Sequence, residues 1–185
     1  MKNYILEVCA DSVESALSAK AGGATRLELC ANLVIGGTTP GYELFEQVKK
    51  ETGLPIRVLI RPRFGDFLYS EYEYQQMLCD VCHFAEAGAD GVVIGSLNAD
   101  GTLNETQMRG LARAAGDSGI TLHRAFDVRD GPHQTRFRSS VNQRMPALTD
   151  PGTKLLHRFF QFRIVSLVCS EINCDVHESV PPFSA

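Results

Sequence analysis

Ala21-Gly-Gly-Ala-Thr-Arg-Leu-Glu-Leu29 is echoed further along the chain by Glu86-Ala-Gly-Ala-Asp-Gly-Val-Val-Ile94. In each segment a helical pattern stops at glycine, and a strand-like run of apolar residues follows. Two equivalent helix-turn-strand corners are expected when one unit is repeated around a barrel or along a sheet. The echo therefore predicts an α/β fold built from repeated units.

Outward from these corners, short β-rich segments alternate with longer segments rich in Ala, Glu, Lys and Leu. This alternation is typical of βαβ units and a parallel sheet. Cap residues such as Ser12 and Asn104, and glycines such as Gly53 and Gly88, mark the expected helix ends. The predicted helices cover about residues 12–22, 41–52, 71–87 and 104–117, and the predicted strands are Tyr4 to Cys9, Thr25 to Cys30, Ile56 to Arg61, Gly91 to Gly95 and Ile120 to Ala125.

The composition indicates one well-buried domain, with 185 residues, 44% of them hydrophobic, and a formal net charge of −4. Because 18 Lys and Arg stand against 22 Asp and Glu without a long basic run, we expect no nucleic-acid partner. The N-terminal apolar run is short and contains Glu7, which predicts no signal peptide, no membrane span and a cytoplasmic location. The six cysteines are then expected to be reduced thiols.

Charged residues occupy the predicted strands, although strands buried on both faces should be almost wholly apolar. Ligand sites of α/β sheets and barrels lie at the carboxyl ends of the strands. The pattern therefore predicts a polar pocket at those ends. An internal layer of salt bridges that only specifies packing is the alternative. The residues expected to converge there are Glu7, Glu28, Arg61, Arg63 and His123.

Cys9 and Cys30 are the last residues of two neighbouring predicted strands, and each follows a glutamate by two residues. Because alternate side chains of a strand share a face, both thiols are expected at one rim of the sheet. Two soft thiolates suit Cu(I), whereas Zn(II) usually takes four ligands. Two small buried hydrophobic residues are the alternative interpretation, since free cysteine is often buried.

Six motifs follow one another along the chain. They are Glu7-Val-Cys9, Arg26-Leu-Glu-Leu-Cys30, Gly36-Gly-Thr-Thr-Pro40, Ile60-Arg-Pro-Arg-x-Gly-Asp-Phe-x-Tyr-Ser70, Gly88-Ala-Asp-Gly-Val-Val-x-Gly95 and His123-Arg-Ala-Phe-Asp127. Together they resemble the motifs of the CutC copper homeostasis family. The resemblance covers about residues 3 to 128 and implies a TIM-type (β/α)8 barrel, of which about five βα units are readable here. It also implies a cytoplasmic protein linked to copper.

The resemblance also assigns roles to individual residues. It places the family's Cu(I) thiols on Cys9 and Cys30, which makes copper the expected ligand. An enzyme of unassigned reaction is the alternative, with His123 or Glu28 as general acid or base and with Arg61 and Arg63 binding a small anionic molecule. By the resemblance, the pocket is lined by Glu7, Glu28, Arg61, Arg63, His123 and Asp127.

The character of the sequence changes after Val128, since 14 of the 16 glycines precede that residue. We expect residues 1–128 to be the amino-terminal part of a CutC-like barrel and residues 129–185 to be an atypical tail, produced by a frameshift, alternative splicing or truncation. Five strands of an eight-stranded barrel would leave unpaired edges. Capping by the tail or homo-oligomerisation could cover those edges, and an aberrant, inactive product is the third possibility.

Overall fold

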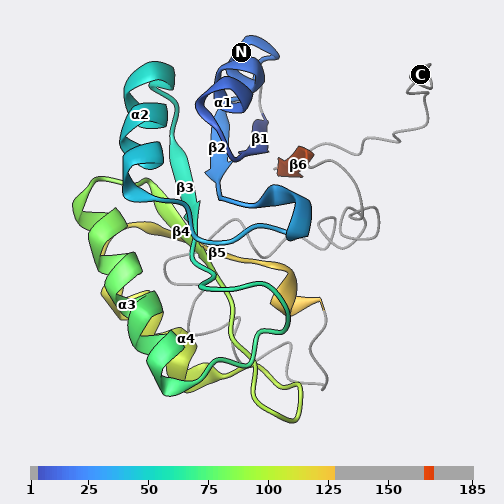
Figure 1. Ribbon diagram of the computed structural model, residues 1–185, viewed down its shortest axis with the longest axis vertical. Helices are drawn as coiled ribbons and strands as arrows, with labels where there is room; N and C mark the ends of the chain where they lie inside the picture. Colours follow the sequence, from blue (N-terminus) through green and yellow to red (C-terminus); the bar gives the residue numbers. More distant parts are fainter. Residues whose placement is uncertain (1–3, 128–164, 169–185) are drawn as a thin grey trace, which may run out of the picture.

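The computed structural model describes residues 4–127 and the backbone of residues 165–168 (Figure 1). Its first part alternates five strands with four helices, as the sequence predicts. Ser12, Ser70 and Asn104 cap three of the helices by accepting backbone N–H groups, which fixes where those helices begin. The elements are β1 (Ile5–Ala10), α1 (Val13–Ala21), β2 (Arg26–Leu29), α2 (Tyr42–Thr52), β3 (Ile56–Leu59), α3 (Glu71–Glu86), β4 (Gly91–Ile94), α4 (Glu105–Ala114) and β5 (Gly119–Leu122), with 3-10 turns η1 (Leu33–Ile35) and η2 (Arg124–Phe126).

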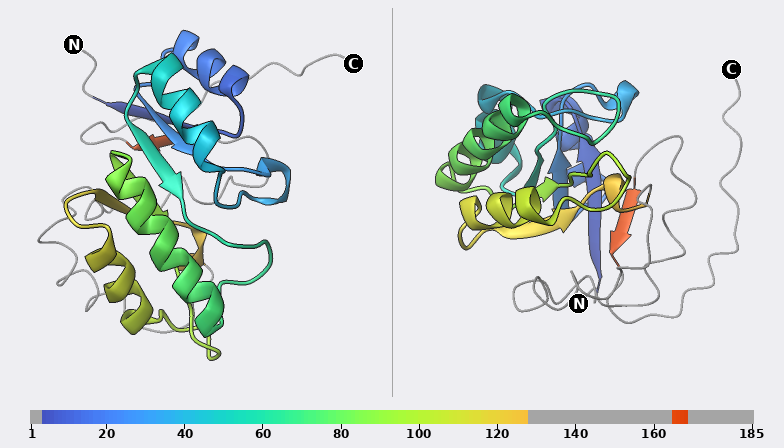
Figure 2. Two further views of the ribbon diagram at one scale, coloured as in Figure 1. Left: turned by 60° about the vertical axis from the view of Figure 1, so that its left-hand side comes forward. Right: turned by 90° about the horizontal axis from the view of Figure 1, so that it is seen from below.

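The strands form one sheet in the order β5-β4-β3-β2-β1-β6, where β6 is Val165–Val168. Each of the strands β1 to β5 lies beside the next one along the chain, and each of these pairs is parallel. Helices α1 to α4 all lie on one side of this sheet (Figure 2). This arrangement of parallel strands with an outer layer of helices is an incomplete TIM-type α/β barrel.

The main hydrophobic core lies between the sheet and the helices. Alternate residues of the strands, such as Leu27, Val58 and Val92, are fully buried on this side. They pack against the apolar faces of the helices, where the rings of Phe45 and Phe84 meet edge to face at 5.4 Å. Among the described residues, the opposite face of the sheet carries a small apolar cluster, Cys30, Leu59 and Val93, beside a row of polar side chains from β1 to β3.

The two echoed segments form equivalent corners, as predicted. Gly23 and Gly88 take positive φ angles of 93° and 79°, a conformation that glycine adopts without steric penalty. The amide that follows each glycine donates to the carbonyl five residues back, Ala24 to Ala19 at 3.0 Å and Ala89 to Phe84 at 2.9 Å.

Each corner also ties its strand to the preceding parallel strand. Thr25 Oγ1 accepts the N–H of Leu6 at 2.9 Å. Asp90 Oδ2 accepts the N–H of Ile56 at 2.8 Å in the same position of the second corner. The repeated unit is therefore a repeated set of hydrogen bonds as well as a repeated sequence.

The tail contributes a feature that the sequence pattern does not specify. β6 pairs with β1 in antiparallel orientation, with Leu6 opposite Leu167, so the β1 edge that we expected to be open has a partner. Within the described residues, β5 pairs only with β4. The rest of the predicted tail, residues 129–164 and 169–185, lies outside the described residues.

Four strands end earlier than predicted. β2 and β4 each stop one residue short, at Leu29 and Ile94, so Cys30 directly follows β2. β3 stops at Leu59 and β5 at Leu122, which leaves Arg61 and His123 just beyond the strands. At His123 the cause is local, because its Nδ1 accepts the N–H of Ala125 and starts the η2 turn. In the described part of the chain, no helix combines the length and apolar character needed to cross a membrane.

Candidate functional site

Polar side chains share the face of the sheet that the helices leave uncovered. In the parallel register Cys9 lies opposite Glu28, and Glu28 lies opposite Arg57. Residues opposite each other in neighbouring strands project to the same face, so these three side chains form one row. One step lower, Glu7 lies opposite Arg26 and forms an ion pair with it, while only 2% of the Glu7 surface is exposed.

The row continues through two glycines, which explains a residue that the sequence analysis did not select. Gly91 and Gly119 lie in register beyond Arg57, and the Arg57 side chain extends across them. A Cβ atom at Gly119 would come within 2.8 Å of Arg57 Nη2. Arg57 reaches Thr121, whose hydroxyl oxygen accepts from Nη1 at 2.5 Å. The sequence signal that could have identified Arg57 was a charged residue within a predicted strand, as at the polar positions of β1 and β2.

Glu28 is a partly buried carboxyl group surrounded by charge. Burial and the nearby Glu7 carboxylate raise the pKa of Glu28 to about 7, against a hydrogen bond from Cys9 and the charges of Arg26 and Arg57. A carboxyl group with a pKa near neutrality can both accept and release a proton at physiological pH. This is the property expected of the general acid or base for which Glu28 is a candidate.

The Cys9 and Cys30 thiols lie near the carboxyl end of the sheet, Cys9 within β1 and Cys30 directly after the neighbouring strand β2. Cys30 is 1% exposed and its Sγ donates to the Ala10 carbonyl at 3.6 Å. Burial raises the pKa of Cys9 far above its ordinary value, and the Glu28 and Cys30 charges add to that effect. Burial and Glu28 raise the pKa of Cys30 to about 12. Both groups are therefore neutral thiols in the free protein.

The side chains around Cys9 and Cys30 limit which metal ion could bind there. The described residues contain no group of three or more His, Cys, Asp or Glu side chains arranged to hold a metal. Two sulfur donors from β1 and β2 fit Cu(I), which prefers soft ligands, better than Zn(II), which usually requires four. Because metals bind thiolates, copper would have to displace the thiol protons.

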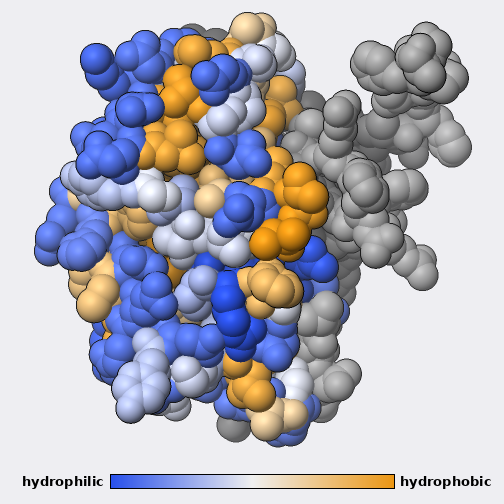
Figure 3. Space-filling model, in the orientation of Figure 1, coloured by the Kyte–Doolittle hydropathy of each residue, from blue (hydrophilic) through white to orange (hydrophobic). Residues whose placement is uncertain are grey.

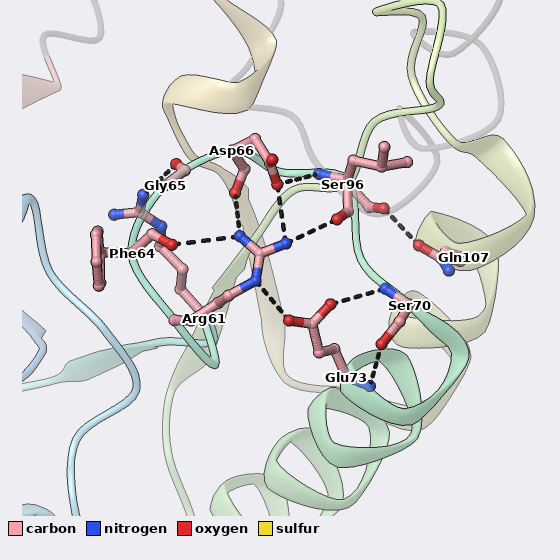
Figure 4. A network of polar contacts seen from close by, with 10 residues as sticks. Arg61, Phe64, Gly65, Asp66, Ser70, Glu73, Ser96 and Gln107 are labelled. Carbon is pink, nitrogen blue, oxygen red and sulfur yellow. Dashed lines mark hydrogen bonds and ion pairs between the residues drawn. The ribbon is translucent and has the colours of Figure 1, made fainter.

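Arg61 is buried at the rim of the sheet, with 5% of its surface exposed. Its Nη1 donates to the carbonyls of Gly36 and Gly37 at 3.1 and 3.0 Å. Its Nη2 donates to the carbonyl of Gly65 at 2.8 Å (Figure 4). Its guanidinium also lies 5.0 Å above the centre of the Phe67 ring. Arg61 thus holds together the loops that follow β2 and β3.

Arg63 is directed into its own loop. Its Nε donates to Glu73 at 2.5 Å, and its Nη2 donates to Asp66 and to the Leu68 carbonyl, each at 2.9 Å. Glu73 also belongs to the capping box of α3 with Ser70, as Figure 4 shows. These bonds lower the pKa of Asp66 and of Glu73. The donors of Arg63 are therefore engaged in ordering the loop before α3.

His123 is packed against Phe67, with a ring-to-ring distance of 4.8 Å and 9% of its surface exposed. Burial and the Arg61 charge lower its pKa to about 3, so the imidazole is neutral. Since Nδ1 accepts the Ala125 N–H at 3.1 Å, the ring proton resides on Nε2. Asp127 acts electrostatically on His123 from the exposed end of η2, where the described segment ends.

The candidate residues fall into two groups in space. Glu7, Cys9, Glu28 and Cys30 belong to the polar face of β1 and β2, together with Arg26 and Arg57. Arg61, His123 and Asp127 belong to the rim, around Phe67. Arg63 stays with the α3 loop.

The fold defines an α/β protein of the TIM-barrel class, and its candidate site residues gather toward the carboxyl ends of the parallel strands. A family model described as the CutC family matches residues 4–138. Since this match covers well over half of the chain, the chain belongs to the CutC family, which confirms the family suggested by its motifs.

Similar proteins support the same assignment. A CutC family protein of Mesorhizobium japonicum is 47% identical over 128 residues, which are 69% of this chain and 50% of that protein. One from Bacteroides thetaiotaomicron is 41% identical over 184 residues and covers 94% of this chain and 74% of its own length. A crystal structure of CutC from Streptococcus agalactiae, which is named a copper homeostasis protein, matches with a TM-score of 0.66 and 29% identity, covering 76% of this chain and 67% of that one.

The chain spans about half the length of most of the relatives that it matches, between 49% and 51% in several bacteria. The family model reaches residue 138 and the Bacteroides thetaiotaomicron alignment extends over most of the chain. The division of the chain at residue 128 stays a prediction.

Proposed function

We propose that this CutC family protein takes part in cytoplasmic copper homeostasis by binding Cu(I) through Cys9 and Cys30. The observation that carries the proposal is that Cys9 lies on β1 and Cys30 directly follows the adjacent parallel strand β2, close enough for a Cys30 thiolate to act on Cys9. Copper(I) prefers sulfur ligands and accepts low coordination numbers, which suits a site with two thiols.

The surroundings of the thiols support a protected site. Cys30 is buried beside Leu59 and Val93, and the loop at Gly37 closes over it, since a Cβ there would lie 3.6 Å from the Cys30 sulfur. Exclusion of water protects a thiol from oxidation and strengthens a metal–sulfur bond. The cationic side chains Arg26 and Arg57 lie on the same face and act on the Glu28 carboxyl group, which neighbours Cys9.

A competition titration with a Cu(I) chelator under reducing conditions tests this proposal. One equivalent of Cu(I) should bind to the full chain, and the Cys9→Ser/Cys30→Ser variant should lose that binding. Cys79→Ser/Cys82→Ser is the matched control, because it removes two thiols from α3, one exposed and one partly buried. Equal binding by all three folded proteins would contradict the proposal.

Catalysis on a small anionic molecule is the second candidate function. It is favoured by buried polar atoms at the strand ends that have no hydrogen-bond partner among the described residues, including Arg61 Nε and His123 Nε2. Glu28 and His123 are its acid or base candidates. Turnover of small phosphate and carboxylate esters, lost in Glu28→Gln, would support this function; no turnover by the folded full chain would count against it.

A further inference from the structure

Two guanidinium groups come together at the rim of the sheet. A Cβ atom built at Gly36 would lie 3.4 Å from Arg61 Nη1 and 3.2 Å from Arg124 Nη1, so both cations border the same glycine. Each charge acts unfavourably on the other, and within the described residues neither arginine forms an ion pair with a carboxylate. Uncompensated positive charge of this kind is costly unless a negative group joins it.

The hydrogen bonds of Arg61 leave one donor unused. Nη1 and Nη2 are engaged with the carbonyls of Gly36, Gly37 and Gly65, whereas the buried Nε has no partner in the described part of the chain. Arginine has no acceptor atom, so only a group that brings oxygen or another acceptor can satisfy Nε.

His123 presents a second unused donor, in a side chain close enough to Arg61 for the Arg61 charge to act on it. Its Nδ1 is occupied by the Ala125 N–H, and its buried Nε2 has no partner among the described residues. The His123 ring and the Arg61 guanidinium both pack on Phe67, at 4.8 and 5.0 Å. Two side chains that each hold an unsatisfied buried N–H group therefore pack on one aromatic ring, and leaving a buried donor without a partner typically costs about 1–3 kcal/mol.

From this arrangement we infer that Arg61, His123 and Arg124 form a binding site for a small oxyanion, the phosphate or carboxylate group of a ligand. All the groups offered are donors or cations, as anion recognition requires. Arg63, by contrast, already has the carboxylates of Asp66 and Glu73. The site is distinct from the thiol pair. It also supplies the ligand class of the second proposed function, and only this link between the oxyanion and catalysis rests on that proposed function.

Calorimetric titration of the full chain with inorganic phosphate, and separately with acetate, tests the site and distinguishes the two sources of the oxyanion. His123→Asn removes Nε2 but keeps a side-chain acceptor for the Ala125 N–H, and Arg124→Gln removes an exposed cation. Each variant should weaken binding of the preferred anion about tenfold, as expected for one charged hydrogen bond or cation. Arg109→Gln, which removes an exposed arginine of α4, should bind like the parent protein.

The outcomes separate the proposals from one another. Unchanged binding in Cys9→Ser/Cys30→Ser would show that the oxyanion site does not depend on the thiols. Binding without turnover would remove the second proposed function and leave the site intact. If neither anion binds the folded parent protein, or if His123→Asn and Arg124→Gln bind as well as Arg109→Gln, the inference is overturned.

Discussion

The Arg57 guanidinium on β3 hydrogen-bonds the Thr121 hydroxyl on β5 at 2.5 Å, across the intervening strand β4. The contact is possible because β4 and β5 carry Gly91 and Gly119 in the register positions beside Arg57. Burial and the Arg26 charge lower the pKa of Arg57, whereas the charges of Glu7, Asp90 and Glu28 act in the opposite direction. One arginine thus ties three parallel strands together on their polar face.

This contact predicts a measurable coupling between the two residues. Thr121→Val should lower the free energy of unfolding by about 1–3 kcal/mol, because it leaves a buried guanidinium N–H without its acceptor. In an Arg57→Met background the same substitution should cost much less. Urea unfolding of the double-mutant cycle measures the difference. Strictly additive effects would show that the bond contributes nothing to stability.

The His123 ring lies so close to Gly95, the residue after β4, that we predict no side chain is tolerated at this position. A Cβ atom at Gly95 would lie 2.3 Å from His123 Cε1 and 2.9 Å from the Ala125 Cβ. Gly95→Ala should therefore lower the free energy of unfolding by about 1–3 kcal/mol through overpacking. Gly22→Ala is the matched control, because its φ of −73° suits alanine and its nearest contacts, at 3.4 Å, are ordinary ones. Equal denaturation midpoints for the two variants would contradict this account.

The protonated state of the thiols predicts their order of alkylation. Cys79 is exposed on α3, Cys9 is partly buried, and Cys30 is buried with a pKa of about 12. Since the thiolate is the reactive form, iodoacetamide at pH 8 should modify Cys79 first and Cys30 much later. Peptide mass spectrometry at successive times gives the order. Early modification of Cys30 in the folded protein would mean that its surroundings are more open than the structure indicates.

The sequence predicts the described fold because its local and periodic signals agree. Ser12, Ser70 and Asn104 cap helices where the pattern starts, and the echoed corners form equivalent hydrogen bonds. β6 could not be predicted, because the apolar stretch around it fits neither the helical nor the strand period and its pairing depends on a free edge of a distant strand.

The candidate site was only partly accessible to sequence reasoning. Strand alternation identifies Glu7, Cys9 and Glu28, since a period of two determines which side chains share a face. It cannot tell that Arg61 is directed to loop carbonyls and Arg63 to carboxylates, because loop geometry depends on contacts between residues far apart in the chain. Arg57 was missed because the two glycines that admit it lie on other strands.

Buried neutral His123 predicts a dependence of stability on pH. Its pKa is about 3 in the folded protein and 6.5 when unperturbed. As the pH falls below 6.5, the unfolded chain takes up a proton at this residue and the folded protein does not, so stability is lost until the folded pKa is reached. Because each unit of pKa shift corresponds to about 1.36 kcal/mol, the full effect is about 5 kcal/mol.

Urea unfolding of the parent protein and of His123→Asn between pH 7 and pH 4 isolates this contribution. Glu28 acts in the opposite direction, because its raised pKa of about 7 makes stability decline as the pH rises from 4.5 to 7. That contribution is common to both proteins and cancels in their difference. The stability gap between parent and variant should therefore shift against the parent as the pH falls, by roughly 2–3 kcal/mol at pH 4. A gap that does not change with pH would show that the His123 imidazole is not held neutral by its surroundings.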